Sequence, residues 1–117
     1  MIVYLFHQTQ QHYKNMALTK TFVKSKSVYK VTFTVPAEAA TDTKKVALVG
    51  EFNGWNPEEA IALKKQKDGS FKTSLELGAG EYQFRYILDD QKWENDWAAD
   101  KYVPAGVDSA ENSVVVL

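Results

Sequence analysis

Polar and apolar residues alternate with a period of two along most of this chain, and this alternation restricts the fold more than any other feature. In "SVYKVTFTV" (residues 27–35) the apolar side chains fall on one face, and Lys and Thr side chains fall on the other. The stretches "SFKTSLEL" (70–77) and "GAGEYQFRYIL" (78–88) alternate in the same way. This pattern is typical of β-strands with one solvated face. Because no stretch has a long helical period, the sequence predicts an all-β protein.

Glycine, proline and acidic residues mark the connections between the expected strands. "KVALVGEF" (45–52) is expected to be a more buried strand, in which Gly50 indicates a close backbone approach or a bulge. Asp68 and Gly69 lie between two short runs and predict a hairpin with a type I′ turn.

Three further segments complete the map. "NPEEAIAL" (56–63) predicts one helical turn opened by its Asn-Pro pair, and "DDQK" (89–92) predicts a tight turn. The polar segment 93–112 is expected to be irregular, and "SVVVL" (113–117) is expected to be the last strand. About seven short strands with regularly spaced turns favour an immunoglobulin-like β-sandwich.

The chain of 117 residues has the size of one domain. Residues 1–15 are rich in Gln and His without a clear period, so we expect a poorly ordered N-terminal extension there and the domain at 16–117. A formal net charge of -1 indicates neither nucleic acid nor an anionic membrane as a partner. The apolar run at 2–6 is too short for a signal core or a membrane span, so we expect a cytoplasmic protein.

The residue types also limit the chemistry. The absence of cysteine excludes disulfides, thiolate metal sites and cysteine catalysis. His7 and His12 lie in the expected extension, and no metal or cofactor is expected. Asp and Glu gather in 89–100, where the alternatives are a calcium loop, a pair of hydrolytic carboxylates or a solvated acidic loop. The fixed ligand spacing of a calcium loop and the depth of a catalytic cleft are both missing, so we expect the solvated loop and no enzyme.

Four side chains stand where the strand map does not need them for a core: Trp55, Arg85, Trp93 and Asn112. Indole rings stack on the apolar C–H faces of sugars, while a guanidinium and an amide supply fixed hydrogen bonds to sugar hydroxyls. The alternatives are structural: Trp55 as a cap over the sandwich edge, Trp93 as an inward ring with nearby Trp97 exposed, Arg85 as a solvated strand residue and Asn112 as a loop hydrogen-bonding residue.

The segment "VALVGEFNGW…KDGSFKTSLELGAGEYQFRYILDDQKW…D…ENSVVVL" resembles the carbohydrate-binding modules of family 48. This early-set domain is shared by isoamylases, glycogen branching enzymes and the β subunit of AMP-activated protein kinase. The resemblance covers about residues 20 to 117, as a free-standing version of the module. It implies an early-set, immunoglobulin-like β-sandwich. It also implies sugar-contacting roles for Trp55, Arg85, Trp93 and Asn112, with Arg85 where the kinase subunit has lysine.

The chain departs from the family pattern at two places. Trp97 replaces a usual proline, and Val107 and Asp108 stand where the kinase module presents a leucine to the glucan. These departures leave the fine specificity of the site open.

Two hypotheses follow from the sequence. The first is a non-catalytic module that binds α-glucan, meaning glycogen, starch or maltooligosaccharide, with a glycogen- or starch-metabolising enzyme as a further candidate partner. The alternative is a protein-interaction module of the same fold, which docks on a partner enzyme through the acidic loop or the open sheet edge at 19–26.

Overall fold

The computed structural model describes residues 18–106 and 110–117. The expected extension at 1–15, with His7 and His12, therefore lies outside the described residues, as do Val107 and Asp108. Short 3₁₀ turns and β-strands make up the regular structure of the described part, as the alternation predicts. The strands are β1 (Leu18–Val23), β2 (Val28–Val35), β3 (Val46–Gly50), β4 (Ile61–Lys65), β5 (Phe71–Leu77), β6 (Glu81–Leu88), β7 (Lys92–Glu94), β8 (Lys101–Pro104) and β9 (Glu111–Val116). The 3₁₀ turns are η1 (Ala37–Ala40), η2 (Glu51–Asn53) and η3 (Pro57–Glu59).

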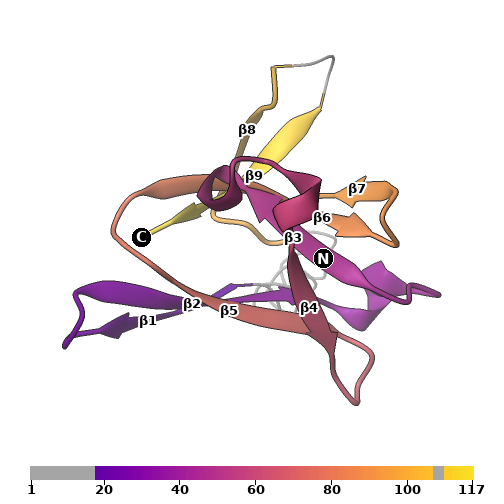
Figure 1. The fold of residues 1–117 in the computed structure, drawn as a ribbon, viewed down its shortest axis with the longest axis horizontal. Coiled ribbons are helices and arrows are strands. Elements are labelled where there is room, and N and C mark those ends of the chain that lie inside the picture. The colour runs from indigo at the N-terminus through magenta and orange to yellow at the C-terminus, as the bar shows by residue number, and fades with distance from the viewer. Residues whose placement is uncertain (1–17, 107–109) are drawn as a thin grey trace, which may run out of the picture.

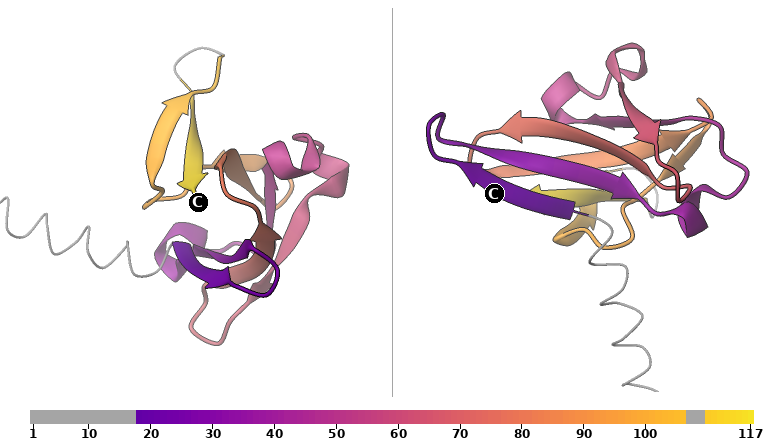
Figure 2. Two further views of the ribbon diagram at one scale, coloured as in Figure 1. Left: turned by 90° about the vertical axis from the view of Figure 1, so that its left-hand side faces the viewer. Right: turned by 90° about the horizontal axis from the view of Figure 1, so that it is seen from below.

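All strand pairs are antiparallel and follow the order β1-β2-β5-β4-β3-β6-β9-β8, with β7 also paired to β6. Strand β4 joins two layers, because its first residues pair with β3 and its last residues pair with β5. Figure 1 shows β1, β2 and β5 in one layer and β3, β6 and β9 in the other, and Figure 2 shows how the sheet curls between them. The fold is the predicted immunoglobulin-like β-sandwich.

The core forms where the apolar faces of the two layers meet. Phe33 of β2 contacts Phe84 of β6 edge to face, with ring centroids 5.1 Å apart, and both side chains are fully buried. Gly50 ends β3 at a close approach to β6: a Cβ added there would lie 2.4 Å from the Gln83 carbonyl oxygen. The predicted close approach is therefore present, and it explains why no larger side chain fits at this position.

The predicted hairpin at Asp68 and Gly69 joins β4 to β5, but the predicted type I′ turn is wrong. Gly69 has a left-handed φ of 89°, whereas Asp68 does not. The Gly69 N–H donates to the Gln66 carbonyl, and the Gln66 N–H donates to the Ser70 carbonyl. These bonds define a type I turn followed by a left-handed glycine, because the Asp68 carboxylate accepts the Ser70 N–H at 2.9 Å and holds Asp68 out of the left-handed region.

A turn with two left-handed residues occurs instead at Asp89 and Asp90, between β6 and β7. Their φ values are 51° and 64°, and the Gln91 N–H donates to the Leu88 carbonyl at 3.1 Å. The Asp89 Oδ1 accepts the N–H groups of Lys44 and Lys45 at 2.9 and 3.0 Å, which fixes the turn against the start of β3. The predicted turn at "DDQK" is confirmed.

The segment expected to be irregular contains two strands that the sequence did not reveal. Strand β7 pairs with β6, and β8 pairs with β9. Both are too short to show a period, so their neighbours decide their conformation. The expected helical turn at 56–63 is likewise shorter than predicted: it is η3, where the Asn56 side chain accepts the Glu58 N–H, and β4 begins at Ile61.

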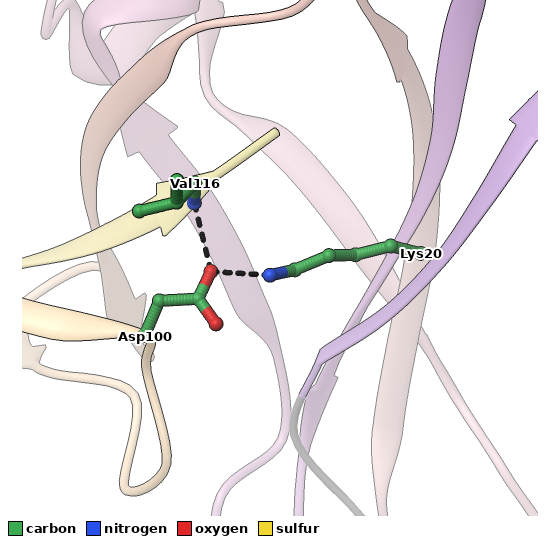
Figure 3. Close-up of polar contacts among 3 residues, drawn as sticks. All are labelled: Lys20, Asp100 and Val116. Atoms are coloured by element: carbon green, nitrogen blue, oxygen red, sulfur yellow. Dashed lines mark hydrogen bonds and ion pairs between the residues drawn. The ribbon is translucent and has the colours of Figure 1, made fainter.

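Asp100 connects the two layers on one side of the molecule (Figure 3). Its Oδ2 accepts the Lys20 ammonium of β1 at 2.6 Å and the Val116 N–H of β9 at 2.7 Å. The edge strand β1 is thereby fixed to the last strand of the opposite layer. Among the described residues, no helix is long and apolar enough to cross a membrane.

Candidate functional site

The outer face of β6 presents Gln83, Arg85 and Ile87, because Phe84 and Tyr86 between them point into the core. Cross-strand partners extend this face sideways: Val49 of β3 lies opposite Arg85, and Trp93 of β7 lies opposite Ile87. Directly opposed residues project to the same side of a sheet. The strand register thus gathers Arg85 and Trp93 on one surface, and the pairing of β6 with β9 places a third candidate residue, Asn112, on the same side of the sheet.

Arg85 lies where two strands share one edge of β6. Strand β9 pairs with β6 from Glu81 to Phe84, and β7 pairs with it from Tyr86 onward. Arg85 falls in the gap between these ladders. The position is specified by pairing alone, which is why the sequence could not distinguish it from an ordinary solvated strand residue.

The Arg85 guanidinium lies over the Trp93 ring, with its carbon 5.1 Å from the ring centroid. Trp93 is 41% exposed, so its ring remains open to solvent while the guanidinium contacts it. Arg85 is half-buried, and its Nε is buried without a protein hydrogen-bond partner. Cation–π contact orients both side chains and presents a rigid aromatic surface beside a cation.

Asn112 projects to this same side of the sheet, because it lies two residues before Val114, the partner of Gln83, and it is 6% exposed. Its Nδ2 donates to the Gln83 Oε1 at 3.0 Å, while its Oδ1 is buried without a protein partner. The side chain at the surface here is Gln83, which is half-buried and held by Asn112. Sequence reasoning missed Gln83, although its two-residue spacing from Arg85 places both on one face.

Trp55 lies in the turn after η2 and is half-buried. Its φ of 60° is left-handed, which bulky residues rarely adopt. The Trp55 N–H donates to the Gly50 carbonyl at 2.9 Å, and the Asn53 side chain accepts the Gly50 N–H and donates to the Leu48 carbonyl. In the described part of the chain, no ring or cation contact joins Trp55 to Arg85 or Trp93. The structure thus places Trp55 in a fixed turn directly after β3, next to Val49, which lies opposite Arg85, but without direct contact with the Arg85–Trp93 pair.

Asp96 is a buried residue that stabilises the segment between β7 and β8 by hydrogen bonds. It is 3% exposed, and its carboxylate accepts the Tyr86 hydroxyl at 2.7 Å and the Ala98 N–H at 2.8 Å. The Tyr102 hydroxyl donates to the Asp96 carbonyl at 2.6 Å. Burial raises the pKa of Asp96 to about 6. The expectation of a wholly solvated acidic loop is therefore wrong at Asp96, because this carboxylate is buried and binds the Tyr86 hydroxyl and the Ala98 N–H.

Within the residues that the structure describes, no group of three or more His, Asp or Glu side chains is arranged to hold a metal ion. The acidic side chains of 89–100 instead serve separate contacts: Asp89 holds the turn, Asp96 holds Tyr86 and Asp100 joins the layers. An exposed cation–π pair next to a held amide, on one face of the sheet, is suited to recognising a polar surface that also offers C–H groups.

This fold and face define a β-sandwich recognition module. Residues 34–117 match the family described as the glycogen recognition site of AMP-activated protein kinase, and the chain belongs to this family. The matched range contains the whole candidate face, and the family description names a recognition site and no reaction.

The chain is also similar to Protein PTST homolog 2, chloroplastic, of Arabidopsis thaliana. The two are 31% identical over 74 residues, which is 62% of this chain and 13% of that protein. The chain therefore spans a small part of the length of this curated relative.

Proposed function

We propose that this chain binds α-glucan on the outer face of β6, without cleaving it. The observation that carries the proposal is the exposed Trp93 ring under the Arg85 guanidinium, within a family of glycogen recognition sites. The guanidinium occupies one face of the indole, so a glucose ring would stack its C–H face on the opposite side.

Polar groups next to the indole would then read the sugar hydroxyls. The buried Arg85 Nε–H donor and the buried Asn112 Oδ1 acceptor both lack protein partners, and such groups normally pair with a ligand or with water. Gln83 presents an amide whose orientation Asn112 fixes. Trp55 would extend the surface beyond the end of β3 that lies beside Arg85 and add a second aromatic contact.

The expected affinity is modest. By analogy with base–aromatic stacking, each ring contact contributes about 1–3 kcal/mol. The free energy of two contacts is partly offset by the translational and rotational entropy lost on binding. The resulting dissociation constants lie in the range of about millimolar to micromolar. A glycogen or starch polymer offers many chain segments, so weak sites of this kind suit a module that holds its partner on a polymer.

The test is binding of maltoheptaose and glycogen to the full chain and to Trp93→Ala. Loss of one stacking contact should weaken maltoheptaose binding about 10- to 100-fold, measured by calorimetry and by retardation in glycogen-containing gels. Trp93→Phe should retain most of the affinity, because a smaller ring still stacks. Gln83→Ala should weaken binding less than Trp93→Ala, because it removes polar contacts only.

Phe22→Ala is the matched control, since Phe22 is 52% exposed but lies on β1 in the other layer. It should bind glucan as the wild type does. Absence of any saturable response from the wild type, up to about tens of millimolar maltoheptaose, would overturn the proposal.

Protein docking is the second candidate function. It is favoured by the edge strand β1, which pairs only with β2 among the described strands and exposes Phe22 against Tyr29 with ring centroids 5.0 Å apart. An exposed aromatic pair on an open edge is suited to strand addition by a partner. Phe22→Ala would then reduce partner binding while leaving glucan binding unchanged.

A further inference from the structure

A groove of about 440 Å³ lies on the side of β7 opposite to Trp93. Lys92 and Glu94 line it, and side chains alternate along a strand, so Trp93 between them projects to the other side. The remaining walls come from η1 and the residues after it, from the turn between β6 and β7, and from Trp97. The groove is therefore distinct from the Arg85–Trp93 face, although the same short strand separates the two.

Trp97 gives this groove an aromatic wall. Its side chain is 40% exposed, nearly as much as that of Trp93. Around it lie groups that can accept or donate single hydrogen bonds, among them the Thr41 hydroxyl, the Gln91 amide and the Glu94 carboxylate. The volume falls in the usual range of small-molecule sites, about 300–1,000 Å³.

Four carboxylates (Glu38, Asp42, Asp89 and Glu94) and one ammonium (Lys92) line the groove, so its formal charge is negative. Lys92 pairs with Glu94 at 3.7 Å, and Asp89 accepts two backbone N–H groups of the strand β3 segment. These bonds from the Lys45 and Lys44 backbone hold the pKa of Asp89 below its usual value. These contacts hold several carboxylate and amide acceptors in place along the groove. Sugar hydroxyls can donate to such acceptors, so a polyhydroxylated ligand fits this lining, and the negative charge makes a basic peptide the competing occupant.

We propose that this groove is a second glucan subsite, in which a glucose unit stacks on Trp97 and its hydroxyls bond to Thr41, Gln91 and Glu94. The inference rests on the proposed function, since it takes the same class of ligand. Two subsites on opposite sides of β7 engage two chain segments of one polymer. The second contact then forms at a high effective concentration, so polymer is retained more strongly than oligosaccharide.

Indole N–H resonances test the two sites separately, because the chain has three tryptophans. The ¹⁵N-labelled full chain is titrated with maltoheptaose, and the Trp97 signal is assigned with Trp97→Phe. We expect saturable shifts of the Trp93 and Trp97 signals in the wild type. In Trp93→Ala the Trp97 signal should still shift on addition of maltoheptaose. In Trp97→Ala the Trp93 signal should shift over the same range of sugar concentrations as in the wild type.

Retention on glycogen supplies the second measurement. Trp97→Ala should lose about tenfold in retention, as expected for one stacking contact, while its maltoheptaose affinity at Trp93 stays within about twofold of wild type. Thr41→Arg, at an exposed position, should block the groove and reproduce this loss without removing an aromatic residue. This second variant decides the question should Trp97→Ala fail to fold, and Phe22→Ala is again the control.

The possible failures are distinguishable. A Trp93 signal that shifts while the Trp97 signal stays fixed overturns the second subsite and leaves the proposed function intact. If neither signal shifts, both proposals fail. If hexalysine shifts the Trp97 signal and maltoheptaose does not, the groove takes a basic protein segment, and the second subsite is overturned.

Discussion

At the scale of single residues, Trp55 combines an unfavourable backbone with a residue type suited to binding. Gly54 and Trp55 are consecutive left-handed residues, with φ values of 65° and 60°. Glycine adopts this conformation freely, whereas a side chain with a Cβ does so at a cost of about 1–2 kcal/mol. Strained residues of this kind cluster at functional sites. The turn therefore favours a binding role for Trp55 over a purely structural one.

Comparison of Trp55→Gly with Trp55→Ala isolates this strain. Both variants remove the indole, but only glycine relieves the left-handed backbone, although it also loosens the unfolded chain. We expect Trp55→Gly to be more stable than Trp55→Ala by about 1 kcal/mol in urea unfolding, with equal losses of glucan binding. Equal stability of the two variants would show that the turn carries no strain at Trp55.

At the scale of elements, the short strands β7 and β8 depend on the buried carboxylate between them. The Asp96 N–H donates to the Ser113 Oγ of β9 at 2.9 Å, and its carboxylate accepts the Tyr86 hydroxyl of β6. This cluster fixes the course of the chain directly after Trp93, so it also determines how the Trp93 and Trp97 rings are presented.

Asp96 should make stability depend on pH in an unusual direction. Its pKa is about 6 in the folded protein against a value of 3.8 for the free group, so the folded state holds the proton more tightly than the unfolded chain. The contribution of Asp96 is therefore most favourable below about pH 4 and falls by about 3 kcal/mol as the pH rises through 6. Asp96→Asn keeps the shape and one acceptor oxygen, replaces the other oxygen with an amide donor, and does not titrate.

The measurement is the unfolding free energy of wild type minus that of Asp96→Asn, from urea titrations between about pH 4 and 7. This difference should decrease between about pH 4 and 6 and then level off. Glu76→Gln, at an exposed carboxylate, should track the wild type within about 0.5 kcal/mol. A difference that stays constant or increases with pH would contradict the assignment.

At the scale of the whole molecule, the two layers are joined by the crossing strand β4, by the aromatic core and by Asp100. The Lys20–Asp100 pair is partly shielded, with side-chain exposures of 31% and 29%, whereas Lys26–Glu76 is more open at 61% and 47%. Shielded pairs are screened less by salt. Only the first pair connects the edge strand of one layer to the other layer.

Substitutions in the Lys20–Asp100 pair should destabilise the protein by different amounts. Lys20→Met and Asp100→Asn each remove the charge attraction, at about 0.5–1 kcal/mol. Asp100→Ala also removes the acceptor of the Val116 N–H and should cost about 1–3 kcal/mol. Lys26→Met should have almost no effect. Urea unfolding at low salt and in 1 M NaCl measures the loss of unfolding free energy for each variant, and the charge contributions should be smaller in 1 M NaCl. Equal losses for Asp100→Asn and Asp100→Ala would contradict a stabilising hydrogen bond from the Val116 N–H.

The sequence by itself determined the layers of this protein. Alternation is a local property of each strand, so it specified which side chains of β2, β5 and β6 enter the core and which face outward, including Arg85. The family motif likewise pointed to Trp55, Arg85, Trp93 and Asn112 before any strand pairing was known.

The tertiary structure decided which residues of different strands are in contact. The meeting of β7 and β9 at Arg85, the contact of Arg85 with Trp93 and the burial of Asn112 beside Gln83 all depend on the register between strands distant in sequence. The same holds for Asp96, which looks like any acidic loop residue until Tyr86 and Ser113 enclose it. Strands as short as β7 and β8 carry too little local preference to fold alone, so only their neighbours in space fix them.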